Sequence, residues 1–135
     1  MNLSSAAMNY VETPFKFRGR SKRGVDCSGL LVVACADSGR MIPDRTDYGR
    51  EPWNDGIEES LDELFHVADF PLQVDDVLLM CIPGRKKPQH IAIVAPYPAG
   101  GLGIIHARSE FKAVKFHYLD PDVYSHILKV YRGRR

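Results

Sequence analysis

The sequence predicts an α+β domain in which helices come first and pack on an antiparallel sheet of about five strands that follows them. Two observations support this fold class. Apolar residues of the N-terminal third recur at helical spacing, first over residues 3–11 and again over residues 30–36. After residue 72 they occur in short runs of strand length separated by Pro/Gly-rich connectors, and consecutive strands joined in this way pair antiparallel.

Length and charge place few limits on function. The 135 residues fit a single domain, residues 1–135, that can bury a core without disulfides or metal. The formal net charge of +1 gives no reason to expect nucleic-acid binding. Basic residues gather over residues 16–23, which would favour an anionic substrate nearby, although such a run is more often a solvated face. Three cysteines without CxxC spacing predict neither a disulfide framework nor a zinc knuckle.

The sequence shows no targeting or membrane segment. Residues 1–5 lack the basic start and apolar core of a signal peptide. No apolar stretch is long enough to cross a membrane. We therefore expect synthesis in the cytoplasm, and any action outside it would need another carrier.

Three helices are expected before the sheet. The first covers residues 3–11 and is ended by Pro14. The second runs from Cys27 to Asp37, because Asp26 is a good N-cap and a Ser-Gly pair supplies the stop. A third is capped by Asp55, and its apolar stripe contains Ile57, Leu61, Leu64 and Phe65.

The remaining segments are a long loop and the strands. Residues 39–56 carry no period, and Tyr48 and Trp53 in this loop would either line a groove or pin the loop to the core. Apolar runs or alternation predict strands at 77–82, 90–95, 104–107, 113–118 and 126–131.

Cys27 is a candidate nucleophile because of its place on a first helical turn. Unpaired N–H groups and the helix dipole stabilise an anion there, so we expect the thiol to ionise more readily than a free one. A thiolate at a helix start can attack a carbonyl if a histidine reaches it. Position alone equally allows Cys27 to be a small apolar core residue.

Two histidines are predicted to meet on one face of a hairpin. A turn centred near Pro98 places His90 opposite His106, with Cβ atoms roughly 5 Å apart. Ala92 shares that face and leaves room for a helix end, so we expect the Cys27 helix to dock there. A register shift of one residue would instead turn one histidine to the other face.

Such a row of residues would support acyl transfer. Cys27 would attack the carbonyl, His90 would take and return the proton, and His106 would fix the tautomer of His90. Backbone N–H groups near the helix start would hold the oxyanion. For either histidine alone, an edge or core residue with a satisfied hydrogen bond is the favoured interpretation. The ligand types would also suit zinc, although the spacing matches no compact metal motif. The remaining histidines have no comparable partner and are expected to be structural or solvent-facing: His66, His117 and His126.

Residues 13–19, 24–30, 76–78, 90–93 and 105–107, taken together, resemble the NlpC-type cell-wall cysteine peptidases. These are papain-like enzymes in which the nucleophile opens a helix packed on an antiparallel sheet. The resemblance implies Cys27 as nucleophile, His90 as base and His106 as the third polar residue, with no metal or cofactor. It also implies that Asp26 and Ser28 hold the free amine of a peptide stem.

The implied substrate is peptidoglycan, cut between D-glutamate and the diamino acid of the stem peptide. Phe15 stands where the family usually has a tyrosine, twelve residues before the cysteine, so a hydroxyl near the oxyanion site is missing from this substrate-binding position. Phe17 and Arg18 stand where tryptophan and glycine are usual. These departures bear on substrate preference more than on rate.

The leading hypothesis is therefore a cysteine endopeptidase acting on wall peptides. A chain without an export signal or a wall-binding module resembles the small peptidases delivered by the tails of long-tailed phages and gene-transfer agents, so tail-tip proteins are expected partners. One alternative is a catalytically silent tail-tip or adaptor module, which Phe15 favours. Another is a related thiol amidase or acyltransferase, since the same triad serves several acyl transfers.

Overall fold

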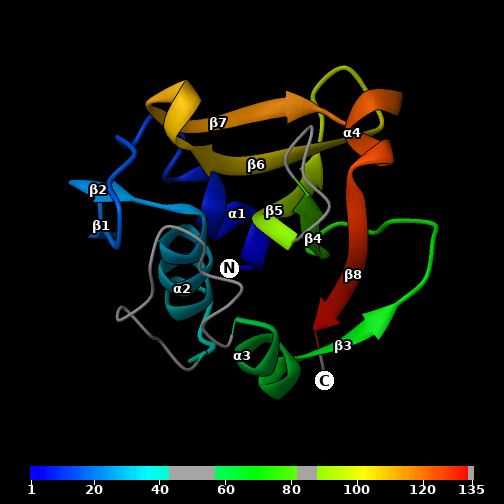
Figure 1. Ribbon diagram of the computed structural model, residues 1–135, viewed down its shortest axis with the longest axis horizontal. Coiled ribbons are helices and arrows are strands. Elements are labelled where there is room, and N and C mark those ends of the chain that lie inside the picture. Colours follow the sequence, from blue (N-terminus) through cyan, green and yellow to red (C-terminus); the bar gives the residue numbers. More distant parts are fainter. Residues whose placement is uncertain (43–56, 82–87, 134–135) are drawn as a thin grey trace.

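The computed structural model describes residues 1–42, 57–81 and 88–133 and confirms the predicted α+β fold. Two N-terminal helices, α1 (Leu3–Met8) and α2 (Cys27–Asp37), lie on the inner side of a curved sheet (Figure 1). Between them, the short strands β1 (Arg20–Ser21) and β2 (Gly24–Val25) form a separate antiparallel ribbon.

The main sheet has six antiparallel strands in the order β3-β8-β4-β5-β6-β7. Three of these strands agree closely with the predicted ranges and form the part of the sheet around the two candidate histidines. They are β5 (Pro88–Pro96), β6 (Leu102–Arg108) and β7 (Ala113–Tyr118). The others are β3 (Phe65–Ala68), β4 (Val77–Cys81) and β8 (Ile127–Gly133). The turns between β6, β7 and β8 carry the single-turn helices η2 (Ser109–Phe111) and α4 (Pro121–Ser125).

The sixth strand arises where the sequence predicted more helix. Helix α3 (Ile57–Leu64) ends at Leu64, and Phe65 opens β3 and pairs with Gly133 of β8. The Phe65 side chain is fully buried, as the helical stripe required, so apolar spacing alone could not distinguish the two structures.

Helix α1 is also shorter than residues 3–11. It ends at Met8, and Glu12 turns into the left-handed region with φ of 73°. The Glu12 N–H then bonds to the Val114 carbonyl at 2.9 Å, so pairing with β7 replaces the last helical turn.

Two apolar clusters lie on opposite faces of the sheet. Ile91 and Ile93 belong to the cluster that contains the buried side of α2, whereas Ala92 belongs to the cluster on the far face. The prediction that α2 docks on the Ala92 face is therefore wrong. The isoleucines offer α2 far more apolar surface to bury than an alanine does, and that area outweighs the space a small residue leaves.

The predicted loop over residues 39–56, including Tyr48, Trp53 and the cap Asp55, falls mostly outside the described residues. Within the described ranges, no helix is long and apolar enough to cross a membrane.

Candidate active site

Cys27 opens α2, and the residue before it organises the helix start. The Asp26 side chain accepts from the Gly29 N–H at 2.7 Å, which confirms the predicted N-cap. The same carboxylate accepts from the Arg18 N–H at 2.9 Å and lies 3.2 Å from the Arg20 guanidinium. Asp26 therefore joins α2 to the chain around the β1–β2 ribbon.

The Cys27 side chain is 8% exposed and reaches the edge of a strand pairing. A backbone hydrogen bond from Ile91 acts on its sulfur and lowers the pKa of the thiol. The ladder between β5 and β6 ends at the pair Ala92–His106, and Ile91 lies one residue beyond this end. The sulfur thus lies beside the point where β5 and β6 part, against the backbone of the residue that follows His90.

The predicted ease of ionisation of this thiol is wrong. Burial, followed by the negative charge of Asp26, raises the pKa of Cys27 to about 12, and the hydrogen bond from Ile91 offsets only part of that rise. The cap carboxylate already occupies a first-turn N–H of α2, and a thiolate would lose its hydration in this buried position. The thiol is therefore neutral at pH 7.

His90 and His106 meet, but in a different register from the one predicted. His106 lies opposite Ala92, a shift of two residues that leaves both histidines on the same face. His90 Nε2 and His106 Nδ1 are 2.7 Å apart, and each side chain is 5% exposed. The predicted pair of imidazoles is thus formed as a diagonal contact across two strands.

His117 extends this pair, and the prediction that it has no partner is wrong. His106 Nε2 lies 2.8 Å from His117 Nδ1, because β7 pairs with β6 so that His117 is opposite Ile104. Extending the hairpin argument from β5–β6 to β6–β7 would have found this contact. The other two histidines fit the expectation for them: His66 is exposed on β3, and His126 bonds within α4 and its cap.

The three imidazoles are neutral at pH 7. Burial lowers the pKa of all three, that of His90 well below its ordinary value and that of His106 to about 3. The positive charge of Arg108 on β6 lowers each of them further. A neutral imidazole can accept a proton, so the base form that catalysis needs is the resting form.

One nitrogen of His90 remains for the thiol. Nε2 is engaged by His106, and Nδ1 makes no hydrogen bond to another described residue. No hydrogen bond joins the Cys27 thiol to the His90 ring among the described side chains. The Ile91 backbone acts on the sulfur, whereas the adjacent His90 shares the face of Ala92, the face opposite the one that the body of α2 covers.

Two further predicted residues flank this centre in sequence. Ser28 is 3% exposed and contributes to lowering the pKa of Cys27, yet its hydroxyl makes no hydrogen bond of ordinary geometry to a described residue. Phe15 pairs with Val25 of β2, donates its N–H to the Lys112 carbonyl at 2.9 Å and packs against the helix-side core. Among the described residues, no three His, Cys, Asp or Glu side chains converge as a metal site would require.

Comparison with solved structures supports the fold. An NLP/P60 family protein similar to lipoprotein from Staphylococcus aureus superposes with a TM-score of 0.67 at 17% identity, and an NlpC/P60 family protein from Bacillus cereus with 0.69 at 21%. Both alignments cover 98% of this chain but only 40% and 39% of those chains. The NlpC/p60 domain of peptidoglycan hydrolase SagA superposes with a TM-score of 0.64 at 20% identity, over 96% of this chain and 95% of that domain.

No curated protein matches the sequence. The sequence pattern of the NlpC/P60 family, in contrast, matches residues 12–132. That range includes α2 with Cys27, the main sheet except the last residue of β8, and the three linked histidines. The chain belongs to the NlpC/P60 family.

Proposed function

We propose that this protein is a cysteine endopeptidase that cleaves peptidoglycan stem peptides between D-glutamate and the diamino acid. The observation that carries the proposal is the bonded pair of buried, neutral imidazoles, His90 of β5 and His106 of β6, next to Ile91 of β5, whose backbone acts on the Cys27 sulfur and lowers its pKa. Family membership and the similarity in fold to a peptidoglycan hydrolase domain support a cell-wall substrate.

In the proposed reaction the thiol is activated only when substrate is present. His90 Nδ1 takes the proton of Cys27 as the sulfur attacks the carbonyl carbon and the C–S bond forms. His106 accepts the Nε2–H of His90 and stabilises the imidazolium. His90 then protonates the leaving amine as the C–N bond breaks, and water activated by His90 hydrolyses the thioester to an acid and the free thiol.

Backbone N–H groups of the first turn of α2 would stabilise the oxyanion. The Gly29 N–H is already used by Asp26, so the groups nearer Cys27 carry this role.

Substrate recognition is assigned to three residues near the thiol. Asp26 and Ser28 would hold the free amine of the stem, and Phe15 would contact the peptide at the position where the family usually has tyrosine. The Asp26 carboxylate already accepts bonds from Gly29 and Arg18. The buried hydroxyl of Ser28 has no hydrogen bond of ordinary geometry to a described residue and is therefore the stronger of the two candidates for the amine.

The test is incubation of purified protein with muropeptides and analysis of the products by mass spectrometry. Wild type should release the diamino-acid fragment, Cys27→Ala should release none, and Cys81→Ala, which removes another thiol, should match wild type. Intact muropeptides with wild type would contradict the proposal. Cleavage of a different acyl bond that depends on Cys27 would favour the amidase or acyltransferase alternative, whereas no Cys27-dependent chemistry would favour the silent structural module.

Delivery by a phage-type tail and contact with tail-tip proteins stay predictions from the sequence. Co-purification of the protein with tail particles, followed by disruption of the particles and detection of the chain, tests them separately from the chemistry.

A further inference from the structure

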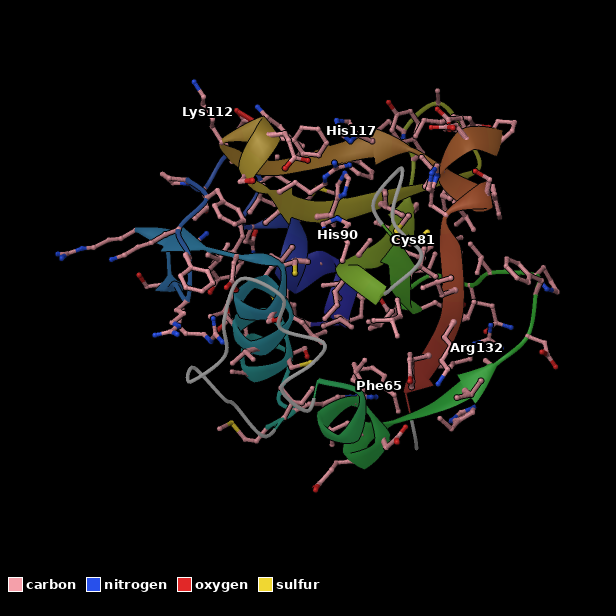
Figure 2. The ribbon with its side chains drawn as sticks, viewed as in Figure 1. Phe65, Cys81, His90, Lys112, His117 and Arg132 are labelled. Atoms are coloured by element: carbon pink, nitrogen blue, oxygen red, sulfur yellow. The ribbon has the colours of Figure 1, made fainter. Side chains whose placement is uncertain are left out.

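Three histidines form a continuous hydrogen-bonded chain across three neighbouring strands. His90 on β5, His106 on β6 and His117 on β7 are linked by nitrogen–nitrogen contacts of 2.7 and 2.8 Å. Each link joins Nε2 of the inner ring to Nδ1 of the next ring outward. Figure 2 shows His90 beside β6 and His117 at β7, farther from α2.

Counting protons leaves this chain only two arrangements. Each neutral ring carries one N–H, and each link needs one hydrogen between its two nitrogens. If His106 carries its proton on Nδ1, His90 must carry its own on Nδ1 and cannot accept from a thiol there. If His106 carries its proton on Nε2, His90 is protonated on Nε2, and its Nδ1 is free to act as the base.

The outer ring selects between these arrangements. In the productive arrangement His117 accepts at Nδ1 and carries its own proton on Nε2. In the other arrangement it carries the proton on Nδ1 and donates it inward to His106. Because His117 is partly exposed while the inner rings are buried, it is the member of the chain that exchanges most readily with solvent.

We propose that His117 is a positioning residue that, by accepting the Nε2–H of His106, holds His90 in the tautomer that can deprotonate Cys27. The effect of His117 on the reaction rate rests on the proposed function, whereas its effect on the tautomers of His90 and His106 does not. Phe111 of η2 supports the geometry, since its ring packs edge-on against His106 and His117 at centroid distances of 5.2 and 5.0 Å.

The surroundings of His117 give the inference a pH dependence. Burial is the largest cause that lowers the pKa of His117, followed by Lys115 on its own strand and Arg108 on β6. Asp120 in the turn before α4 raises this pKa, but the net shift is a lowering. A protonated His117 has hydrogen on both nitrogens and cannot accept from His106. The productive arrangement is therefore lost as pH falls through the pKa of His117, which lies below the ordinary value for an imidazole.

Two variants separate an acceptor role from simple packing. His117→Asn keeps an acceptor oxygen but cannot titrate, whereas His117→Phe keeps the ring contact with Phe111 and removes the acceptor. At pH 7 we expect kcat for muropeptide cleavage to fall roughly tenfold or more in His117→Phe with KM little changed, and to be largely retained in His117→Asn. His66→Phe, the same substitution at an exposed histidine, should match wild type. The low-pH loss of kcat should move to lower pH in His117→Asn.

Tautomers read directly by ¹⁵N imidazole NMR make the test independent of cleavage. Wild type and His117→Asn should show His90 and His106 protonated on Nε2, and His117→Phe should show a mixture or the opposite tautomer. Equal losses of kcat in both variants, or His90 tautomers that do not respond to His117→Phe, would overturn the inference. If wild type cleaves no muropeptide, the proposed function fails, and the NMR result alone decides the role of His117.

Discussion

The pKa of the Cys27 thiol is set by opposing effects of its surroundings. Its place on the first turn of α2 favours the thiolate, yet burial and the adjacent Asp26 raise its pKa to about 12. The thiol and the neutral His90 therefore rest as an uncharged pair. Activation by proton transfer during attack follows from the raised pKa of the thiol and the lowered pKa of His90, and a preformed thiolate–imidazolium pair does not.

Alkylation of Cys27 should accordingly be slow at neutral pH. The rate with iodoacetamide should rise by about tenfold per pH unit above pH 7, because only the thiolate reacts and its fraction grows until the pH reaches the pKa. Asp26→Asn keeps a good N-cap but removes the charge that raises the pKa, so it should react faster at each pH. Peptide mass spectrometry measures both rates, and alkylation of wild type at pH 7 as fast as a free thiol would contradict the expectation.

At the scale of elements, the start of α2 is fixed by a close packing of chain segments. A Cβ at Gly29 would lie 2.0 Å from the Gly19 carbonyl oxygen and 2.8 Å from the Arg20 guanidinium. Gly29 therefore lets the chain before β1 approach the first turn, where Asp26 bonds to both. The position of Cys27 depends on this contact.

Gly29→Ala should thus disturb the site rather than stabilise the helix. Alanine favours helix by about 1 kcal/mol over glycine, but here its methyl group would displace backbone. We expect a lower melting temperature and at least tenfold lower Cys27-dependent activity. Ala36→Gly, at an exposed position of the same helix, should cost about 1 kcal/mol by propensity alone and leave activity unchanged. An active, stabilised Gly29→Ala protein would refute this view of the helix start.

At the scale of the whole molecule, an ion pair between a buried carboxylate and a partly exposed arginine joins the last strand to the segment before β4. Asp76, fully buried before β4, accepts from Arg132 of β8 through two nitrogens at 2.8 and 2.9 Å and from the Gln73 N–H at 2.8 Å. Next to this ion pair, β8 pairs with β3 at Arg132 and with β4 at Tyr131. The Asp76 carboxylate is thus bonded both by the neighbouring Gln73 and by Arg132, near the end of the chain.

Arg132→Met should destabilise the fold by about 3 kcal/mol, because it leaves a buried carboxylate without its partner. The matched change Lys115→Met removes a cation from an exposed pair with Glu12 and should cost less than about 1 kcal/mol. Denaturant unfolding followed by circular dichroism measures both. Similar costs for the two variants would show that the Asp76–Arg132 pair contributes no more than a surface ion pair.

Much of the fold was predictable because it depends on local chemistry. The Asp26 cap and the apolar run after it predict the bounds of α2, and strand alternation alone places His90 and His106 on a common face. A side chain's face depends only on whether its position is odd or even, so a two-residue error in register left that prediction intact. Phe65 marks the limit of such arguments, since helix and strand both bury it.

Sequence alone therefore determined the α+β order of elements, the start of α2 at Cys27 and the shared face of two histidines. Tertiary structure decided the register of β5 on β6, the face that α2 covers, the addition of His117 to the histidine chain and the high pKa of the Cys27 thiol. These depend on which apolar surfaces meet and on how much water each group loses. Both are set by residues distant in the chain, so no local pattern contains them.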